Sequence, residues 1–423
     1  MPSERSRVDA FVQRLLTFGR VDELASRLRP RNDAAPPKIP GGALVSGPAL
    51  ERRWNLIGGR PAAIADDPAT TDAPAYAHNI EHYIGTLKVP LGLAGPLRVN
   101  GLFAHGDFYI PLATTEAALV ASYSRGACLL TESGGCSAIV VNEGLTRAPA
   151  FAFRSLEQAG LFVGWAVMQI DQFRHAAEQT TQYGKLIDLR VTLEGNHVYL
   201  HFEFTTGDAS GQNMVTIATE AICRFIEQNA PIKPEYWFLE ANLSGDKKAS
   251  AVSFLGVRGK KVSAEVHVPG DLLERRLRTT AEQMANYWRM AAMGAVMSGS
   301  MGVHGHYANG LAALYLATGQ DVACVAESAV GVTRFETRAD GALYASVTLP
   351  NIIVGTVGGG CGLPSQREAL RILGLEGSGK AAALVEVAAA LCLAGELSII
   401  GAFCSGEFAR AHARRARGKD NAQ

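Results

Sequence analysis

A lone carboxylate, that of Glu116, is the first side chain in the sequence whose surroundings suggest a chemical role. Glu116 lies in ATTEAALVASYSRGA, residues 113–127, a helical pattern that is mostly apolar. The spacing predicts a helix whose glutamate shares one face with Leu119, Val120 and Tyr123, because residues three, four and seven apart stack on the same side. A carboxylate buried there without a partner favours its neutral form, which is the form a general acid needs. Glu116 is therefore a candidate proton donor.

Two further charged groups have both a chemical and a structural interpretation. SGDKKAS, residues 244–250, places Asp246, Lys247 and Lys248 in a turn before an apolar run. A lysine held away from water can stabilise an oxyanion, although lysines in such turns are more often solvated. Asp321 follows a predicted helix end at Gly319 and could simply begin the next element.

Three glycine-rich stretches are candidates for phosphate binding. GDASGQNM (207–214) opens a predicted helix, whose free N–H groups suit a pyrophosphate. GTVGGG (355–360) follows a predicted strand, and its glycines permit positive φ and close approach of a ligand. Neither fits GxGxxG, so an ordinary Rossmann site is unsupported. GLEGSGKA (374–381) approaches the P-loop pattern, but Ala381 replaces the required hydroxyl and a flexible turn is favoured.

The histidines do not predict a metal site. His304 and His306, two residues apart in VHGHYANG, would diverge on a helix, and no cluster of further ligands lies near them in the sequence. Hydrogen-bonded histidines beside a polar site are the favoured interpretation. His412 lies on the basic stretch FARAHARRARG, which is either a helix end with cations that suit its dipole or a histidine beside a phosphorylated ligand.

Composition limits the classes of partner. The 423 residues carry 40 basic and 40 acidic side chains, so no net charge draws the chain to nucleic acid or to a membrane surface, and a small-molecule partner is favoured. Glu386 and Glu396 interrupt the most apolar segment, which argues against a membrane span. The N-terminal stretch lacks the pattern of a secretion signal. Seven cysteines without a CxxC pair favour a reducing cytoplasm.

The elements that must position these residues form a mixed pattern. We expect a helical N-terminal arm and a Pro-rich linker, then hairpins and helices that alternate along the rest of the chain. The predicted elements are an N-terminal helix over 5–28, a hairpin over 185–204, a helix over 215–228, a second hairpin from strands 249–257 and 261–268, and two closely packed helices within 279–317.

The motifs taken together resemble the hydroxymethylglutaryl-coenzyme A reductase family. They occur in the order of that family from about Asn79 to His412. The matching stretches are IGTLKVPLGLAGPL, ATTEAALVAS, GLTRAP, GDASGQNM, GDKKA, ATGQD, GTVGGG and a histidine on a C-terminal helix.

The resemblance implies a fold of the α/β (α+β) class. A large mixed domain that binds coenzyme A would carry an inserted, small, ferredoxin-like domain that binds NAD(P), and both termini would be helical. The expected boundaries are 1–50 for the helical arm and linker, 51–148 and 239–400 for the large domain, 149–238 for the inserted domain, and 401–423 for the C-terminal helix with the catalytic histidine.

The resemblance also implies the reaction and its catalytic residues. Members of the family reduce a thioester to an alcohol by two hydride transfers, and they are homodimers with the active site at the interface. By similarity, Lys247 would stabilise the oxyanion and Glu116 would donate a proton. Asp321 would keep Lys247 charged and help Glu116 to hold its proton. His412 would protonate the departing coenzyme A thiolate.

Binding residues are implied by matching position. Arg147 resembles the anchor for the free carboxylate of the substrate, with Asp246, Lys248 and Asn309 alongside. Ser122 and Arg125, roughly opposite Glu116 on the predicted helix, resemble coenzyme A contacts. The residues that match the cofactor-binding segments are Asp208, Ser210, Gly211, Gln212, Asn213, Gly358 and Gly359. NADPH is favoured over NADH, with Lys185 as the candidate contact to the 2′-phosphate.

Several positions depart from the family pattern. The usual SGN is Glu240-Ala241-Asn242, which puts an acid where a hydroxyl would meet the carboxylate of the substrate. ENVIGY appears as EHYIGT, and KNLVG appears as MAAMG at 290–294. Three hypotheses follow. The chain reduces 3-hydroxy-3-methylglutaryl-coenzyme A to mevalonate, reduces a different acyl thioester, or is a catalytically silent homologue that binds coenzyme A. The serine phosphorylated in some relatives is Gly418 here, so we expect no such control.

Overall fold

The computed structural model describes residues 46–56, 73–77 and 79–407, with four isolated positions nearer the N-terminus. The predicted arm and linker therefore lie almost wholly outside the described residues, and His412 lies outside them too. Contacts divide the chain into two units, Met1–Gly85 and Thr86–Gln423. The elements described in the first unit are the helix α3 (Gly47–Leu56) and the 3₁₀ helix η1 (Ala73–Tyr76).

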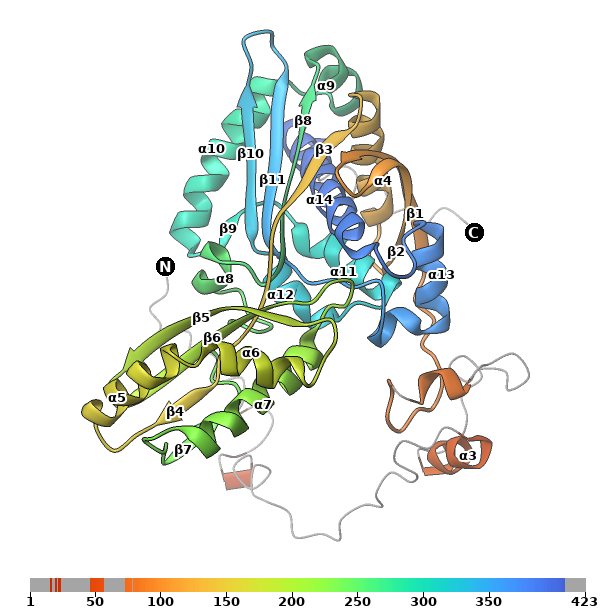
Figure 1. Ribbon diagram of the computed structural model, residues 1–423. Helices are drawn as coiled ribbons and strands as arrows, with labels where there is room; N and C mark the ends of the chain where they lie inside the picture. The colour runs from red at the N-terminus through yellow and green to blue at the C-terminus, as the bar shows by residue number, and fades with distance from the viewer. Residues whose placement is uncertain are drawn as a thin grey trace. The chain divides into compact units, whose positions relative to one another are not determined.

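A mixed sheet lies at the centre of the second unit, with strand order β2-β1-β3-β8-β11-β10-β9 (Figure 1). β1 and β3 run parallel, as do β9 and β10, and the other neighbours are antiparallel. The inner strands alternate buried and less buried side chains, as expected when one face of a sheet is packed. The strands are β1 (Leu91–Gly101), β2 (His105–Ala113), β3 (Cys136–Arg147), β8 (Gly259–Val268), β9 (Gly302–Val303), β10 (Gly331–Thr337) and β11 (Leu343–Ile352).

Helices cover this sheet, and the longest, α14 (Ala381–Cys404), packs against β8, β11, β3 and helix α4 (Figure 1). The others are α4 (Leu119–Glu132), α8 (Ala251–Leu255), α9 (Gly270–Leu277), α10 (Ala281–Ser298), α11 (Tyr307–Thr318), η2 (Val322–Cys324), α12 (Val325–Ser328), η3 (Gly359–Gly362) and α13 (Pro364–Ile372). Within the described part of the chain, α14 is the one helix with the length and apolar composition of a membrane span. Its most apolar window is 83% buried, as in the core helix of a folded domain.

Two glutamates, Glu386 and Glu396, are fully buried within the apolar helix α14, and hydrogen bonds make this burial possible. Glu386 accepts hydrogen bonds from the backbone N–H groups of Phe103 (2.9 Å) and Ala104 (2.7 Å). Glu396 accepts from those of Gly305 (2.7 Å) and His306 (2.9 Å). Hydrogen bonds of this kind offset the cost of burying a carboxylate. These residues therefore attach neighbouring loops to the core helix.

A second sheet, β7-β4-β6-β5, is formed by the segment between β3 and α8, and it is antiparallel throughout. The chain order strand–helices–strand–strand–helix–strand is that of a ferredoxin-like unit. The end of β3 also pairs with β6, so one strand joins both sheets. The elements are β4 (Ala150–Ala152), α5 (Leu156–Val167), α6 (Ile170–Glu178), β5 (Lys185–Glu194), β6 (His197–Thr205), α7 (Gln212–Asn229) and β7 (Tyr236–Phe238).

The predicted mixed α/β fold is confirmed, and so are the hairpin β5–β6, the helix α7 and the presence of two helices within 279–317. The predicted close packing of those two helices is wrong, because α10 packs on β10 and α14 rather than on α11. The second predicted hairpin is wrong, because its first half forms helix α8. Ser250 caps this helix by accepting a hydrogen bond from the N–H of Ser253, and β8 pairs instead with β3 and β11. The domain boundary predicted at 400 falls inside α14, which continues to Cys404. The other predicted boundaries stay predictions.

Candidate active site

Lys247 and Asp321 form an ion pair, with 2.8 Å between Nζ and Oδ2. Asp321 caps the short helix η2 by accepting a hydrogen bond from Ala323 N–H at 3.0 Å, and Lys247 lies in the turn before α8. Lys247 has φ of 56°, a backbone conformation that non-glycine residues rarely adopt. Its backbone N–H donates to Glu327 Oε1 at 3.2 Å, which helps to hold that conformation. The hydrogen bond to Asp321 raises the pKa of Lys247 above its ordinary value, so the ammonium stays charged at neutral pH.

A network of ion pairs lies behind this lysine, and we name it the charge cluster: Arg147, Glu240, Asp246, Arg258 and Glu327. Arg147 Nη1 lies 3.3 Å from Glu240 Oε2 and 3.0 Å from Asp246 Oδ2. Arg258 lies 2.8 Å from Asp246 Oδ1 and 2.6 Å from Glu327 Oε2. Burial acts to raise the pKa of Asp246, but the two guanidinium groups outweigh it and lower that pKa. The cluster fixes the turn that carries Lys247.

Helix α7 contributes to the same cluster from the ferredoxin-like unit. Arg258 Nη2 donates to Gln212 Oε1 at 3.0 Å, and Arg147 Nη2 donates to Thr216 Oγ1 at 2.9 Å. Gln212 was predicted to belong to the cofactor-binding segment, and it lies at the first position of α7. The structure therefore connects the segment expected to bind cofactor directly to the charges that hold the turn carrying Lys247.

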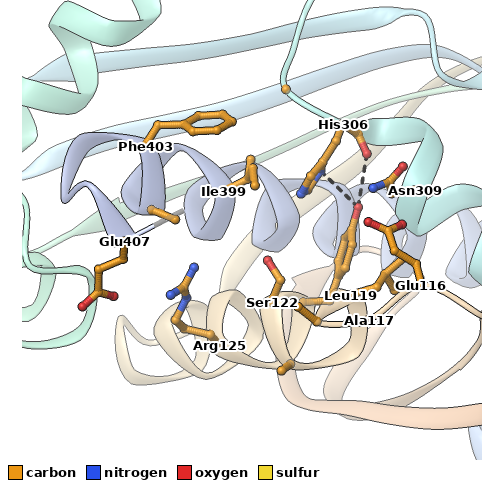
Figure 2. Close-up of a pocket in the computed structure, with 15 residues that line it drawn as sticks. Glu116, Ala117, Leu119, Ser122, Arg125, His306, Asn309, Ile399, Phe403 and Glu407 are labelled. Atoms are coloured by element: carbon orange, nitrogen blue, oxygen red, sulfur yellow. Dashed lines mark hydrogen bonds between the residues drawn. The ribbon is translucent and has the colours of Figure 1, made fainter. Parts of the chain in front are cut away.

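A pocket of about 520 Å³ lies at the start of α4, between that helix, the start of α11 and the end of α14 (Figure 2). The side chains of Glu116 and Asn309 point toward one another on one side of it. Arg125 donates to the carbonyl and the hydroxyl of Ser398 at 2.8 and 3.0 Å, and Ser122 Oγ lies 2.9 Å from Ser398 Oγ. Ligands with both polar and apolar parts suit such a lining, which also includes Leu119, Ile399 and Phe403.

The structure corrects the predicted setting of Glu116. Helix α4 begins only at Leu119, after Ala118 with φ of 74°, so Glu116 lies in the preceding loop and is exposed in the chain. The predicted helical face with Glu116 on it is therefore wrong. Ser122 and Arg125, expected roughly opposite Glu116, instead line the same pocket, because the loop folds back over the helix start.

The predicted catalytic residues that the structure describes fall into two groups near opposite ends of α11. Glu116 forms one group, and Lys247 with Asp321 forms the other. Asn309, beside Glu116, lies in the first turn of this helix, and Asp321 follows its C-cap, Gly319. Twelve residues of helix correspond to about 18 Å. Among the described residues, neither Lys247 nor Asp321 lines the pocket. Asn309, expected beside Arg147, lies in the pocket instead, whereas Lys248 is close to Asp246, donating to its carbonyl at 3.0 Å.

The two predicted cofactor segments lie against each other. Thr356 N–H donates to the carbonyl of Asp208 at 2.9 Å, and a Cβ at Gly355 would come within 2.6 Å of the backbone nitrogen of Ser210. Glycine at 355 is therefore required by this contact. The carboxylate of Asp208 accepts from the N–H groups of Gly379 (2.6 Å) and Ala381 (3.1 Å), so Asp208 occupies the start of α14. GLEGSGKA is thus a turn between α13 and α14, as predicted.

The residues present fit a dinucleotide. Helix α7 follows Gly211, which has φ of 81°, and no side chain caps it, so backbone N–H groups at its start are available to an anion. Gly358 and Gly359 have positive φ, and a Cβ on either would meet no atom of the described structure within 4 Å. This leaves open space beside the glycine loop. Asn213 follows Gln212 in the first turn of α7.

The histidines of VHGHYANG are half-buried, and His306 lines the pocket. Burial lowers the pKa of both His304 and His306 to about 4, so both imidazoles are neutral at neutral pH. Tyr123 Oη lies 3.3 Å from His306 Nδ1. No group of three potential metal ligands occurs among the residues for which the structure gives a placement.

Sequence reasoning missed Arg258 and Glu327, the most buried ion pair of the cluster, at 1% and 0% side-chain exposure. Each is a lone charge within an otherwise apolar or small stretch, GVRG and VAESAV. That is the same signal that drew attention to Glu116. The signal is weak, because it marks Glu116, which is exposed, as readily as these two buried residues.

Comparisons with known proteins agree with this arrangement. Residues 51–417 match the family model for hydroxymethylglutaryl-coenzyme A reductase. The 3-hydroxy-3-methylglutaryl-coenzyme A reductase of Pyrococcus horikoshii is 45% identical over 342 residues, covering 79% of this chain and 82% of its own length. That of Haloferax volcanii is 42% identical over 377 residues, covering 87% and 93%. The fold is similar to a structure of the class II enzyme from Streptococcus pneumoniae bound to NADPH (TM-score 0.63, 20% identity, 78% and 89% coverage).

Proposed function

Because the chain belongs to the hydroxymethylglutaryl-coenzyme A reductase family, we propose that it reduces 3-hydroxy-3-methylglutaryl-coenzyme A to mevalonate and coenzyme A. The observation that carries the proposal is the Lys247–Asp321 ion pair, which is fixed by the charge cluster and connected through Gln212 to the cofactor segment. The nicotinamide cofactor, when bound, supplies a hydride in each of two steps, first to the thioester and then to the aldehyde.

Lys247 stabilises the negative charge that develops on the carbonyl oxygen in both steps. An ammonium already held by hydrogen bonds needs no rearrangement when the oxyanion forms, which is the condition for effective electrostatic stabilisation. Asp321 keeps that ammonium protonated, as the raised pKa of Lys247 indicates. The hydrogen bond from the backbone N–H of Lys247 to Glu327 fixes the turn, which holds the ammonium of Lys247 in one region of the site.

Protons are supplied by two other groups. Glu116 donates to the oxygen of the carbonyl as it is reduced, and its side chain lines the pocket and points toward that of Asn309. His412 protonates the coenzyme A thiolate as it leaves, so that the thiolate does not add back to the aldehyde. Its role is proposed from the matching C-terminal histidine of the family.

The pocket beside Glu116 accommodates part of the substrate. Ser122 and Arg125 contact the coenzyme A portion, and the hydroxyl and guanidinium suit the amides and phosphates of that group. Arg147, Asp246 and Lys248 form the end of the site that meets the distal part of the acyl group.

We propose NADPH as the preferred cofactor, bound between the start of α7 and the glycine loop by Asp208, Ser210, Gly211, Gln212, Asn213, Gly358 and Gly359. The fold neighbour from Streptococcus pneumoniae binds NADPH, which supports this choice. Lys185, the candidate contact for a 2′-phosphate, is exposed and lies 3.1 Å from Glu178. Its charge is therefore partly compensated before cofactor binds.

We propose further that the active site is completed across a homodimer. Glu116 and the Lys247–Asp321 pair lie near opposite ends of α11, so a second subunit is the source of the missing half of each site. Helix α10 supports association, because Met290, Met293, Val296 and Met297 expose 58% to 82% of their surface along it. An exposed apolar row of this kind is typical of a surface that another protein covers.

We place the reaction in the cytoplasm. All seven cysteines lie within the described structure and none forms a disulfide, which is typical of proteins in a reducing compartment.

A steady-state assay tests the proposed function directly. Consumption of NADPH and of NADH is followed by absorbance with the hydroxymethylglutaryl thioester, and mevalonate is identified as the product. Oxidation of two equivalents of NADPH per thioester supports the proposal. Coenzyme A binding with no oxidation of either cofactor would instead identify the chain as a catalytically silent homologue.

A further inference from the structure

Arg147 has no terminal nitrogen left for a ligand. Its Nη1 contacts Glu240 and Asp246, at 3.3 and 3.0 Å, and its Nη2 contacts Thr216 at 2.9 Å and Gln212 at 3.5 Å. Only Nε, which is buried, has no hydrogen-bond partner in the described structure, and a single donor does not make the pair that a carboxylate needs. The residue is only 7% exposed. A guanidinium that serves as an anchor for a substrate carboxylate needs a free pair of donors. In this chain, side chains of the protein already use them.

Glu240 is the occupant that could be displaced. Ser244 Oγ donates to its Oε2 at 2.9 Å, and its side chain is 25% exposed, the highest value among the acids of the charge cluster. Its other oxygen, Oε1, is buried and has no hydrogen-bond partner in the described structure. A second carboxylate brought to Arg147 would face this unpaired anionic oxygen.

The charge balance of the cluster also disfavours a second carboxylate at Arg147. Two buried cations, Arg147 and Arg258, are set against three carboxylates, those of Glu240, Asp246 and Glu327. Among these five side chains the carboxylates therefore outnumber the cations by one. Of the two lysines beside them, Lys247 is paired with Asp321 and Lys248 is exposed. Since repulsion between like charges is strong where water is excluded, a further carboxylate is disfavoured and an uncharged group is not.

We propose that Glu240 is a specificity-determining residue that occupies Arg147 in place of a substrate carboxylate. The chain then accepts acyl-coenzyme A thioesters with an uncharged distal end about as well as the hydroxymethylglutaryl thioester, which must compete with Glu240. This inference rests on the proposed thioester reduction and concerns only the distal end of the acyl group.

Two substrates of nearly the same shape test the proposal: 3-hydroxy-3-methylglutaryl-coenzyme A and 3-hydroxy-3-methylbutyryl-coenzyme A, which lacks the carboxylate. Glu240→Ser should lower the ratio of KM for the first thioester to KM for the second by about tenfold, a comparison that cancels any general effect of the substitution on the charge cluster. Glu240→Gln, which keeps the shape and removes the charge, should act in the same direction. Glu235→Gln removes a carboxylate from the exposed pair with Arg154 and is the matched control, with no expected change in either KM.

The outcomes separate this inference from the proposed function. If the wild-type chain reduces neither thioester, the proposed function fails, and calorimetric titration with free 3-hydroxy-3-methylglutarate still decides the role of Glu240. Tighter binding of this diacid to Glu240→Gln than to wild type supports the proposal. A wild-type chain that strongly prefers the hydroxymethylglutaryl thioester, with a preference unchanged or weakened in both Glu240 variants, would overturn it.

Discussion

Within one chain, the side chains of the charge cluster are buried and paired with one another, whereas the pocket is open and its carboxylate is exposed. In the cluster, Arg258 and Glu327 are almost fully buried and paired at 2.6 Å, and the network extends to the backbone of Lys247. In the pocket, Glu116 is exposed and faces open space beside Asn309. The half of the site that we propose stabilises the oxyanion is thus fixed by folding. We expect the half proposed to donate protons to acquire its surroundings from substrate and from a second subunit.

The largest expected effect is on stability, at the centre of the charge cluster. Arg258→Ala leaves Glu327 and Asp246 with buried, uncompensated charge, and removing one partner of such a network costs about 3–5 kcal/mol. Denaturant-induced unfolding measures this loss. Arg98→Ala is the matched control, because the Arg98–Asp107 pair is 2.7 Å long but 44% exposed on both sides. Equal shifts of the two unfolding midpoints would contradict the view that the cluster is a rigid support.

The next effect is on catalysis. Lys247→Ala removes the cation at the oxyanion and should lower kcat by about 10²-fold or more, with little change in stability, because the lysine side chain is 46% exposed. Steady-state kinetics with the hydroxymethylglutaryl thioester and NADPH measure this loss of kcat. Lys233→Ala is a control, since its ammonium bonds only to the carbonyls of Glu227 and Gln228 at the end of α7. A Lys247 variant with near-normal turnover would remove this residue from the mechanism.

A smaller effect concerns the pH dependence of the reaction. Asp321 raises the pKa of Lys247, so the functional ammonium form persists as pH rises. In Asp321→Asn this support is lost, the pKa of Lys247 falls, and the alkaline limb of the profile of kcat/KM against pH should move to lower pH. An alkaline limb that stays in place, or moves to higher pH, would show that another group controls it.

The smallest effect is expected at Lys185. Because Glu178 already pairs with it on the surface, Lys185→Ala should raise KM for NADPH by only about two- to threefold and leave KM for NADH unchanged. Measurement of both values in the same preparation checks this. Equal changes for the two cofactors would place Lys185 away from the 2′-phosphate.

The fold was largely predictable where the pattern was local and strong. The hairpin β5–β6 and helix α7 follow directly from alternation and from 3.6-residue periodicity. The strand predicted at 249–257 was wrong, since so short a segment of mixed pattern carries little signal and the cap at Ser250 favours the five-residue helix α8. Local sequence also did not reveal that Ala118, with φ of 74°, delays the start of α4 and moves Glu116 off the helix.

One contact of the candidate site could be predicted from the sequence, but the wider arrangement of its residues could not. Resemblance placed Lys247 beside Asp321, and the structure brings them to 2.8 Å. The saturation of Arg147 by Glu240 could be anticipated only as a conflict of charges, because which donors an arginine uses depends on segments distant in the sequence. The roles assigned to the site residues stay predictions until variants are measured.

The central claim is that one active site combines Glu116 of one subunit with Lys247 of the other. Glu116→Gln and Lys247→Ala chains are co-expressed with different affinity tags, and the mixed dimer is purified on both tags. One of its two sites then contains both native residues, so the account predicts about half of the wild-type activity from two variants that are each nearly inactive alone. A mixed dimer no more active than its separate parents would contradict the account.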